Sequence, residues 1–171
     1  MLKVGQINYC DITNGEGIRV SIFVSGCKFH CKGCFNEETW DYSYGNQFTI
    51  ETFNELKRLI SNDNISGLSL LGGDPMWQDD DGLIWLCALC DYVHSINKNV
   101  WLWTGFTFEQ IMNKGSICQM DLLKSCDVIV DGQFDYTKRN LNLQWCGSEN
   151  QRVIDVKKSL KENKVVLYRA T

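Results

Sequence analysis

Three cysteines, Cys27, Cys31 and Cys34, lie close together in the segment GCKFHCKGC. Their CxxxCxxC spacing follows an apolar, β-branched segment at residues 19–25, which we interpret as a strand. Cysteines this close in a loop can converge on one metal centre, and thiolates are soft ligands that suit iron–sulfur clusters and zinc. A cubane cluster has one more iron than there are cysteines here, so one iron stays open to a substrate, as in open catalytic zinc sites. We therefore predict a 4Fe–4S cluster on these thiols.

The alternative is a zinc-binding module in which His30 completes a set of three cysteines and one histidine. His30 is adjacent to Cys31, and neighbouring residues seldom both reach one tetrahedral ion. Zinc modules also usually draw their second pair of ligands from further along the chain. A third interpretation, three unrelated core cysteines, fits poorly because Lys28, His30 and Lys32 make the segment polar.

The chain has nine cysteines, and the other six show no comparable ligand pattern. Cys87 and Cys90 form a CxxC pair, but they lie on a predicted helix among apolar neighbours, so we expect buried, reduced thiols. The remaining four are scattered along the chain: Cys10, Cys118, Cys126 and Cys146. In a reducing compartment many cysteines indicate metal binding or catalysis rather than disulfides.

Composition and charge exclude some classes of function. A chain of 171 residues fits one domain, and its 44% hydrophobic and 22% charged residues are ordinary for a globular protein. The net charge is −4 and no basic run exceeds two residues, which argues against a nucleic-acid-binding surface. No stretch approaches the length of a membrane span, and no signal peptide is visible, so we expect a cytoplasmic protein without a membrane partner.

Strand and helix patterns alternate along the chain. We expect strands at residues 4–9, 19–25, 67–71, 99–104, 127–131 and 165–168. We expect one helix that ends at residue 60 with Thr49 as its N-cap, and another that starts at the acidic residues 79–81 and continues to residue 93. Two further helices are expected at residues 108–113 and 153–162.

This alternation predicts an α/β fold with a mainly parallel sheet. A full eight-stranded barrel typically needs about 250 residues, more than this chain has. We therefore expect residues 1–171 to form a single domain with a partial, open βα barrel. Folds of this kind place their ligands at the carboxyl ends of the strands, so the site should lie there.

The cysteine segment resembles the signature of radical S-adenosylmethionine enzymes. Over nearly its whole length the chain resembles, more narrowly, the activating enzymes of anaerobic (class III) ribonucleoside-triphosphate reductases. The segments that carry this resemblance are DITNGEGIRVSIFVSGC (11–27), GCFNEETW (33–40), LGGDP (71–75), VWLWTGF (100–106), DVIVDGQF (127–134) and GSENQRVIDV (147–156).

The resemblance implies a radical S-adenosylmethionine barrel and a radical reaction. S-adenosylmethionine would bind the open iron, and a flavodoxin or a ferredoxin-type protein would donate an electron. Cleavage would then produce a 5′-deoxyadenosyl radical, which abstracts hydrogen from a glycine of the large reductase subunit. An open barrel suits such a macromolecular substrate, because its open side can admit a peptide loop.

The resemblance also assigns S-adenosylmethionine contacts. The turn with Gly72, Gly73 and Asp74 would meet the methionine end, although many relatives have glutamate where this chain has Asp74. Glycines there let the backbone approach a ligand closely. The segment with Gly33, Cys34 and Phe35 would lie along the adenine.

Other positions carry weaker expectations. Asn36 either hydrogen-bonds the ligand or caps a helix that starts at Glu37. Thr104 ends a strand where a sugar hydroxyl could be met. We expect Trp101 and Trp103 to pack in the core, and Asp131 and Gln133 to line the cavity. Arg19 is expected to pair with the N-terminal loop, the ligand or the partner protein. Arg152 is expected either to meet a carboxylate or to lie on the surface.

Two other functions stay open from the sequence. One is another radical S-adenosylmethionine enzyme, either an activase for a formate-lyase-type enzyme or a deazaguanine synthase. The segment GSENQRVIDV would be unexpected in a formate-lyase activase. The other is the zinc-binding module described above.

Overall fold

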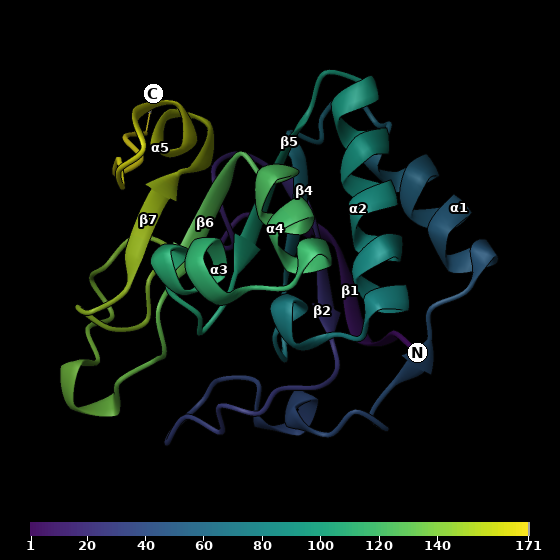
Figure 1. Cartoon of the computed structure of the whole chain (residues 1–171). Helices are drawn as coiled ribbons and strands as arrows, with labels where there is room; N and C mark the ends of the chain where they lie inside the picture. Colours follow the sequence, from purple (N-terminus) through teal and green to yellow (C-terminus); the bar gives the residue numbers. More distant parts are fainter. Residues whose placement is uncertain (171) are drawn as a thin grey trace.

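A computed structural model describes residues 1–170, which form one seven-stranded sheet in the order β3-β1-β2-β4-β5-β6-β7 (Figure 1). The strands are β1 (Lys3–Asp11), β2 (Arg19–Val24), β3 (Asn46–Gln47), β4 (Gly67–Gly72), β5 (Asn99–Trp103), β6 (Val128–Asp131) and β7 (Arg152–Asp155). The α-helices are α1 (Ile50–Ile60), α2 (Asp80–Ser95), α3 (Phe108–Lys114), α4 (Ile117–Lys124) and α5 (Val156–Glu162). Short 3-10 helices span Glu37–Trp40, Pro75–Trp77 and Tyr136–Lys138.

The middle of the sheet is parallel and its edges are antiparallel. Strands β2, β4, β5 and β6 pair in parallel. Strand β1 runs antiparallel to both β2 and β3, and β7 runs antiparallel to β6. The edge strands β3 and β7 do not pair within the described residues, so the sheet stays open. The predicted α/β class is confirmed, whereas the parallel arrangement is restricted to the four central strands.

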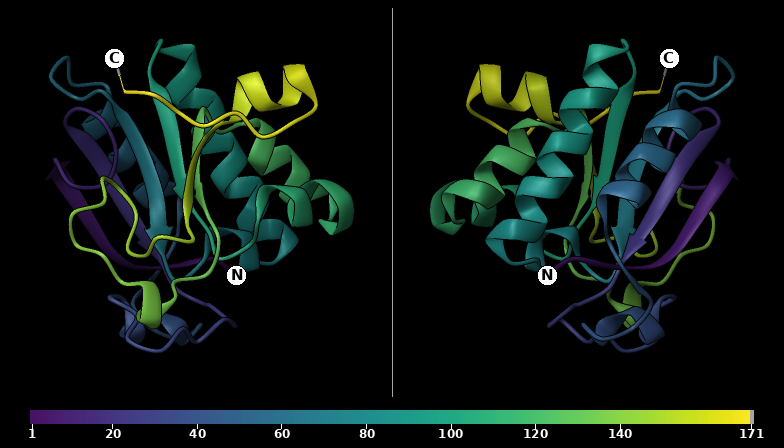
Figure 2. Two further views of the ribbon diagram at one scale, coloured as in Figure 1. Left: turned by 90° about the vertical axis from the view of Figure 1, so that its left-hand side faces the viewer. Right: turned by 90° about the vertical axis from the view of Figure 1, so that its right-hand side faces the viewer.

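Four helices cover one face of the sheet, and a loop crosses the other face. Helices α1, α2, α3 and α4 stand on one face, and part of the segment 132–151 crosses the other face (Figure 2). Fully buried side chains from the helices pack on the sheet and form the main core; they include Leu56, Ile60, Leu86, Leu89, Val93, Leu122 and Leu123. Among residues 1–170, no helix has the length and apolar character needed to cross a membrane.

Local capping explains where the first two long helices begin. The Thr49 side chain accepts a hydrogen bond from the backbone N–H of Thr52, as the sequence predicts for α1. The Asp79 side chain accepts from Gly82 N at the start of α2, at the acidic triplet that was expected there. Each cap satisfies a backbone N–H that has no partner inside its helix.

Two predictions about the later elements are wrong, and one helix was missed. Residues 153–155, the start of the helix expected at 153–162, belong to strand β7 instead, because Val153 and Ile154 pair with Val130 and Ile129 of β6. The helix starts only at Val156, with Asp155 as its cap. Residues 165–168 form one isolated bridge, from Leu167 to Ile154, instead of a strand. Helix α4, which Ser116 caps, was not predicted at all.

The carboxyl ends of the parallel strands bring four loops together. Residues 25–45 follow β2, residues 73–79 follow β4, residues 104–107 follow β5 and residues 132–151 follow β6. These segments lie at the lower end of the sheet in Figure 1, and the views in Figure 2 agree. This is the end at which the sequence predicts the site.

Candidate functional site at the carboxyl ends of the strands

The three clustered cysteines line one cavity of about 110 Å³. Cys27 is buried, whereas Cys31 and Cys34 are half-buried. The loop that carries them closes on itself, since Gly26 N donates to Thr39 O at 2.7 Å and Cys27 N to Trp40 O at 3.1 Å. We call this cavity the thiol cavity. The structure thus brings together the three residues whose spacing predicts a metal centre.

Two glycines let the cysteine loop follow its path. Gly26 has φ +106° at the end of β2 and Gly33 has φ +73° between Cys31 and Cys34. A Cβ on Gly33 would lie 2.6 Å from the ring of Tyr136, which covers this part of the loop. The backbone N–H of Asn36 donates to the Cys34 sulfur at 3.4 Å, and this contact fixes the direction of the thiol.

Aromatic rings close one side of the thiol cavity. The centroid of Phe29 lies 5.0 Å from that of Phe106 and 5.6 Å from that of Trp77. Phe29 fits there because Gly105 has no side chain; a Cβ at Gly105 would lie 2.5 Å from the Phe29 ring. Phe29 thus gives this side of the cavity an apolar lining, and the two neighbouring rings support it.

The thiols lie in surroundings that disfavour a bare thiolate. Burial raises the pKa of the Cys27 thiol to about 12, and burial also raises the pKa of Cys31. A thiolate is therefore stable here only beside a cation, which a bound metal centre provides. The donor set is three soft sulfur ligands, which fits an iron–sulfur cluster.

The zinc alternative has less support from the geometry. The His30 ring is stacked on Trp40, with centroids 4.7 Å apart, and it is not among the residues lining the thiol cavity. Among residues 1–170, no three His, Cys, Asp or Glu side chains gather as ligands for a single ion. A cluster distributes its protein ligands over several irons, so its thiols need not converge on one point.

Asp74 lies beside the thiols and joins two turns of the site. Its side chain is 1% exposed and lines the thiol cavity. One carboxylate oxygen accepts from Met76 N, and the other accepts from Thr104 Oγ1 and Gly105 N at 3.0 and 2.8 Å. Burial raises the pKa of this carboxyl to about 7, although the three hydrogen bonds favour the carboxylate.

Thr104 also lines the thiol cavity, but its hydroxyl already has partners. The hydroxyl donates to Asp74 and accepts a hydrogen bond from Phe106 N at 3.1 Å. The structure therefore gives Thr104 a positioning role between two turns. Its contact with a sugar hydroxyl stays a prediction.

A second, larger cavity of about 460 Å³ adjoins the thiol cavity. The two share Cys34, Gly73, Trp103, Phe134 and Gln151. The larger cavity is also lined by three residues that the sequence assigned to S-adenosylmethionine, namely Phe35, Asn36 and Gly72. The structure thus places most of the predicted ligand-binding residues around two neighbouring cavities.

Neighbouring backbone leaves no room for a side chain at Gly72 or Gly73. A Cβ on Gly72 would lie 2.6 Å from the backbone of Phe23, and a Cβ on Gly73 would lie 2.6 Å from the carbonyl oxygen of Gly26. The turn after β4 therefore presses directly against β2 and the start of the cysteine loop. The glycines were expected to let the backbone approach a ligand. In the structure they let the turn after β4 approach the backbone of β2 and of the cysteine loop.

The Asn36 side chain does not cap a helix, and Phe35 does not belong to the core. Asn36 precedes the 3-10 helix Glu37–Trp40, but its side chain makes no capping hydrogen bond, so the capping alternative is wrong. Phe35 is 59% exposed and not part of the core. Its ring lies 5.5 Å from that of Phe134.

Comparison with known proteins agrees with this geometry. Residues 13–154 match the family model of the 4Fe-4S single cluster domain. The chain is 40% identical to the anaerobic ribonucleoside-triphosphate reductase-activating protein of enterobacteria phage T4, over 89% of this chain and 93% of that protein. The proteins of the same name from Vibrio cholerae and Escherichia coli K12 are 38% and 33% identical, over 82% and 84% of this chain and 90% and 92% of theirs. The chain belongs to this family of activating proteins.

In this member of the activating-protein family, the range matched by the 4Fe-4S domain contains eight of the nine cysteines. It contains Cys27, Cys31 and Cys34, whereas Cys10 lies before it. Cys87 and Cys90 lie on helix α2, and neither lines the two cavities. Cys146 does line the larger cavity, which its sequence context did not indicate.

Gln151 is a residue of this activating protein's site that the sequence did not single out. Its side chain accepts from Gly147 N at 2.8 Å and donates to the carbonyl oxygen of Gly132 at 2.9 Å, and it lines both cavities. It therefore holds two parts of the 132–151 segment in place beside the thiol cavity. The only sequence signal was its position in the NQR segment at the end of a loop.

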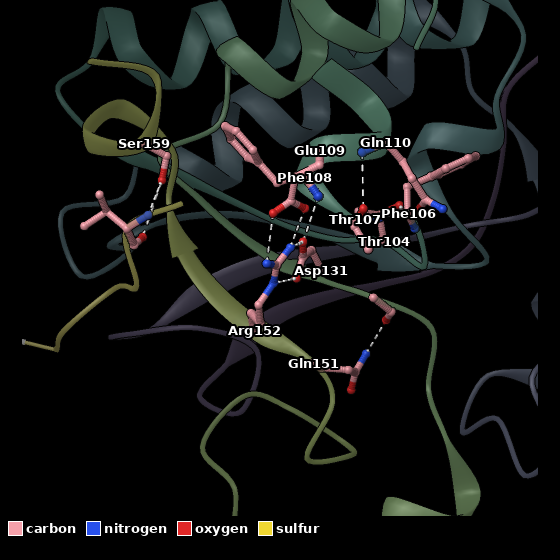
Figure 3. Close-up of polar contacts among 12 residues, drawn as sticks. Thr104, Phe106, Thr107, Phe108, Glu109, Gln110, Asp131, Gln151, Arg152 and Ser159 are labelled. Atoms are coloured by element: carbon pink, nitrogen blue, oxygen red, sulfur yellow. Dashed lines mark hydrogen bonds and ion pairs between the residues drawn. The ribbon is translucent and has the colours of Figure 1, made fainter. Parts of the chain in front are cut away.

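Asp131 does not line the cavity, contrary to expectation. It is 1% exposed and accepts from Arg152 Nε and Nη2 at 3.0 and 2.6 Å and from Phe108 N at 2.7 Å (Figure 3). Arg152 also pairs with Glu109 at 2.7 Å, so it meets two carboxylates. Gln133 is exposed and lines neither cavity.

Trp101, Trp103 and Arg19 have clear structural positions. Trp101 is buried as expected, with Trp145 and Tyr168 against its ring. Trp103 lines both cavities, so it is more than a packing residue. Arg19 is fully buried at the start of β2 and donates to Ser69, Leu68, Asn99 and the carbonyl oxygen of Glu16, which anchors the N-terminal loop.

Proposed function

We propose that this chain activates an anaerobic ribonucleoside-triphosphate reductase by reductive cleavage of S-adenosylmethionine at a 4Fe–4S cluster. The observation that carries the proposal is the thiol cavity, where three cysteines of the matched 4Fe-4S domain meet. The relatives that match most of the chain are named as activating proteins of this reductase.

Cys27, Cys31 and Cys34 would hold the cluster. When bound, it supplies an electron to S-adenosylmethionine, which yields a 5′-deoxyadenosyl radical able to take hydrogen from a glycine of the large reductase subunit. The chain contributes shape and surroundings. Phe29, packed against its aromatic neighbours, gives the thiol cavity an apolar side, and Asp74 joins the turns after β4 and β5.

S-adenosylmethionine would occupy the inner part of the larger cavity, where it joins the thiol cavity. In this position Gly33, Cys34 and Phe35 would lie along the adenine, and Asn36 has a side chain free of capping contacts. The turn of Gly72, Gly73 and Asp74 would face the methionine end and Thr104 the sugar. The lining residues that the two cavities share support this arrangement.

We further propose that the fold is a partial barrel of the radical S-adenosylmethionine type. Four central parallel strands carry the site at their carboxyl ends, and the sheet does not close. We include in the proposal that the chain is one such domain. The open side would admit a glycine-bearing segment of the large reductase subunit.

The electron would come from a flavodoxin or a ferredoxin-type protein of the cytoplasm. Iron–sulfur potentials span about −700 to +450 mV, and cleavage of a sulfonium requires the low end of that range. None of the nine cysteines forms a disulfide, which agrees with a reducing compartment.

Metal analysis after anaerobic purification tests the cluster. We expect about four irons per chain in the wild type, as a 4Fe–4S cluster requires, and loss of iron and of S-adenosylmethionine cleavage in Cys31→Ala. Cys10→Ala is the matched control, because Cys10 is exposed and outside the matched domain, and it should keep both. One zinc per chain without iron would instead support the zinc-binding module.

A radical transfer assay tests the substrate. Reduced enzyme is mixed with S-adenosylmethionine and either the large reductase subunit or a formate-lyase-type protein, and glycyl radical is recorded by electron paramagnetic resonance. We expect the signal only with the reductase. A signal on the formate-lyase-type partner alone would contradict the proposal.

A further inference from the structure

Exposed apolar side chains line the larger cavity or lie beside the loop that borders it. Phe35 and Leu141 line this cavity and are 59% and 75% exposed. Tyr136 is 49% exposed and lies against the backbone of Gly33, two residues before Phe35. We call Phe35, Tyr136 and Leu141 the rim. Exposed apolar side chains grouped beside a cavity mark an interaction site, because covering them removes apolar surface from water.

Two cations lie on the rings of the rim. The Arg139 guanidinium is 5.3 Å from the centroid of Phe35, and the Lys32 ammonium is 5.8 Å from the centroid of Tyr136. Within residues 1–170 neither forms an ion pair, whereas the neighbouring Lys138 pairs with Asp135. The rim therefore presents apolar surface with positive charge beside it, in a chain whose net charge is −4.

We propose that the rim is the docking surface for the large reductase subunit, around the segment that carries its target glycine. This inference rests on the proposed function, which requires that a glycine Cα reach the inner part of the cavity. Hydrogen transfer demands close approach of the reacting atoms. The chain on either side of the glycine must therefore cross the rim.

The composition of the rim defines the chemistry of its partner. Aromatic residues and arginine are the types enriched at protein interfaces, and they contribute most of the binding energy when a partner covers them. The two unpaired cations call for carboxylates on the partner. We therefore expect a glycine segment with apolar neighbours and acidic residues at its edge.

The test compares binding of the partner with assembly of the metal centre. The double variant Leu141→Asp/Arg139→Glu alters the rim, and neither residue lines the thiol cavity. We expect its Kd for purified large reductase subunit, measured anaerobically by calorimetry, to rise at least tenfold. Its iron content after anaerobic reconstitution should equal that of the wild type.

A matched control changes the same residue types elsewhere. Ile117 is 73% exposed at the start of α4 and Lys161 is exposed on α5, away from both cavities. Ile117→Asp/Lys161→Glu introduces a similar change of charge and should bind the reductase with the wild-type Kd.

Several results would overturn the rim assignment. One is that the double variant binds the reductase with the wild-type Kd, and another is that the control variant binds it equally weakly. A third is that the double variant loses only the S-adenosylmethionine cleavage driven by flavodoxin, which would assign the rim to the electron donor. Wild-type self-association that the double variant abolishes would assign it to a second copy of this chain. Failure of the proposed function is distinct, because then even the wild type would not cleave S-adenosylmethionine with dithionite.

Discussion

The carboxylate of Asp74 accepts a hydrogen bond from the hydroxyl of Thr104 at 3.0 Å, inside the wall of the thiol cavity. This contact joins the turn after β4 to the turn after β5, thirty residues further along the chain. Both groups are almost completely buried, so water does not compete for the bond.

Removal of the Thr104 hydroxyl should loosen the site. In Thr104→Val, Asp74 loses one donor and Phe106 N loses its acceptor, which should lower the free energy of unfolding by about 1–3 kcal/mol. Thr104→Ser keeps the hydroxyl and should stay close to the wild type. Urea unfolding followed by tryptophan fluorescence measures both, and equal losses in the two variants would show that the methyl group matters instead.

The raised pKa of Asp74 predicts a pH dependence of stability. The pKa is about 7 in the folded protein against 3.8 as the ordinary value, so the folded state holds this proton more tightly. The stabilisation is complete below pH 4 and is lost as the pH rises through 7. Asp74→Asn does not titrate, so the stability of the wild type relative to this variant should fall by about 2 kcal/mol between pH 5 and pH 8. Unfolding in urea at both pH values provides the measurement, and a constant difference would contradict the assignment.

The ion pair of Arg152 with Asp131 should stabilise the edge of the sheet next to the site. Removal of one partner of a fully buried pair costs about 3–5 kcal/mol. Since Arg152 is 34% exposed, we expect the lower value of about 2–3 kcal/mol for Arg152→Met, because water partly screens the pair. The control Glu109→Gln removes only the exposed partner and should cost about 1 kcal/mol or less. Thermal or urea unfolding of the two variants would contradict the expectation if their losses were equal.

Gly33→Ala should impair the cysteine loop for two separable reasons. The positive φ of residue 33 costs about 1–2 kcal/mol for a non-glycine residue. The new Cβ would also clash with the ring of Tyr136. We expect reduced iron content after anaerobic reconstitution, partly restored in Gly33→Ala/Tyr136→Ala.

Gly132→Ala is the matched control for that experiment. Gly132 has φ +94°, but the nearest atom to its Cβ would lie 3.6 Å away, so only backbone strain remains. Its iron content should exceed that of Gly33→Ala. Equal iron loss in both variants would show that the clash with Tyr136 is unimportant.

The sequence by itself determined the features that depend on short separations along the chain. Cys27, Cys31 and Cys34 fall in one loop, so their spacing alone indicated a shared metal centre. Thr49 and Asp79 cap helices whose first N–H groups are their immediate neighbours, and the central strands follow from apolar runs. Local interactions of this kind are legible because the partners are adjacent in sequence.

Only the tertiary structure decided the features that join distant segments. Tyr136 covers Gly33, Gln151 holds the turn at Gly132, and Asp74 meets Thr104, and none of these pairs has a sequence signature. The same holds for residues 153–155, which the sequence predicts as helix and which pair with β6 instead. In each case the stabilising partner lies far along the chain, so its contribution exists only once the sheet has brought the two segments together.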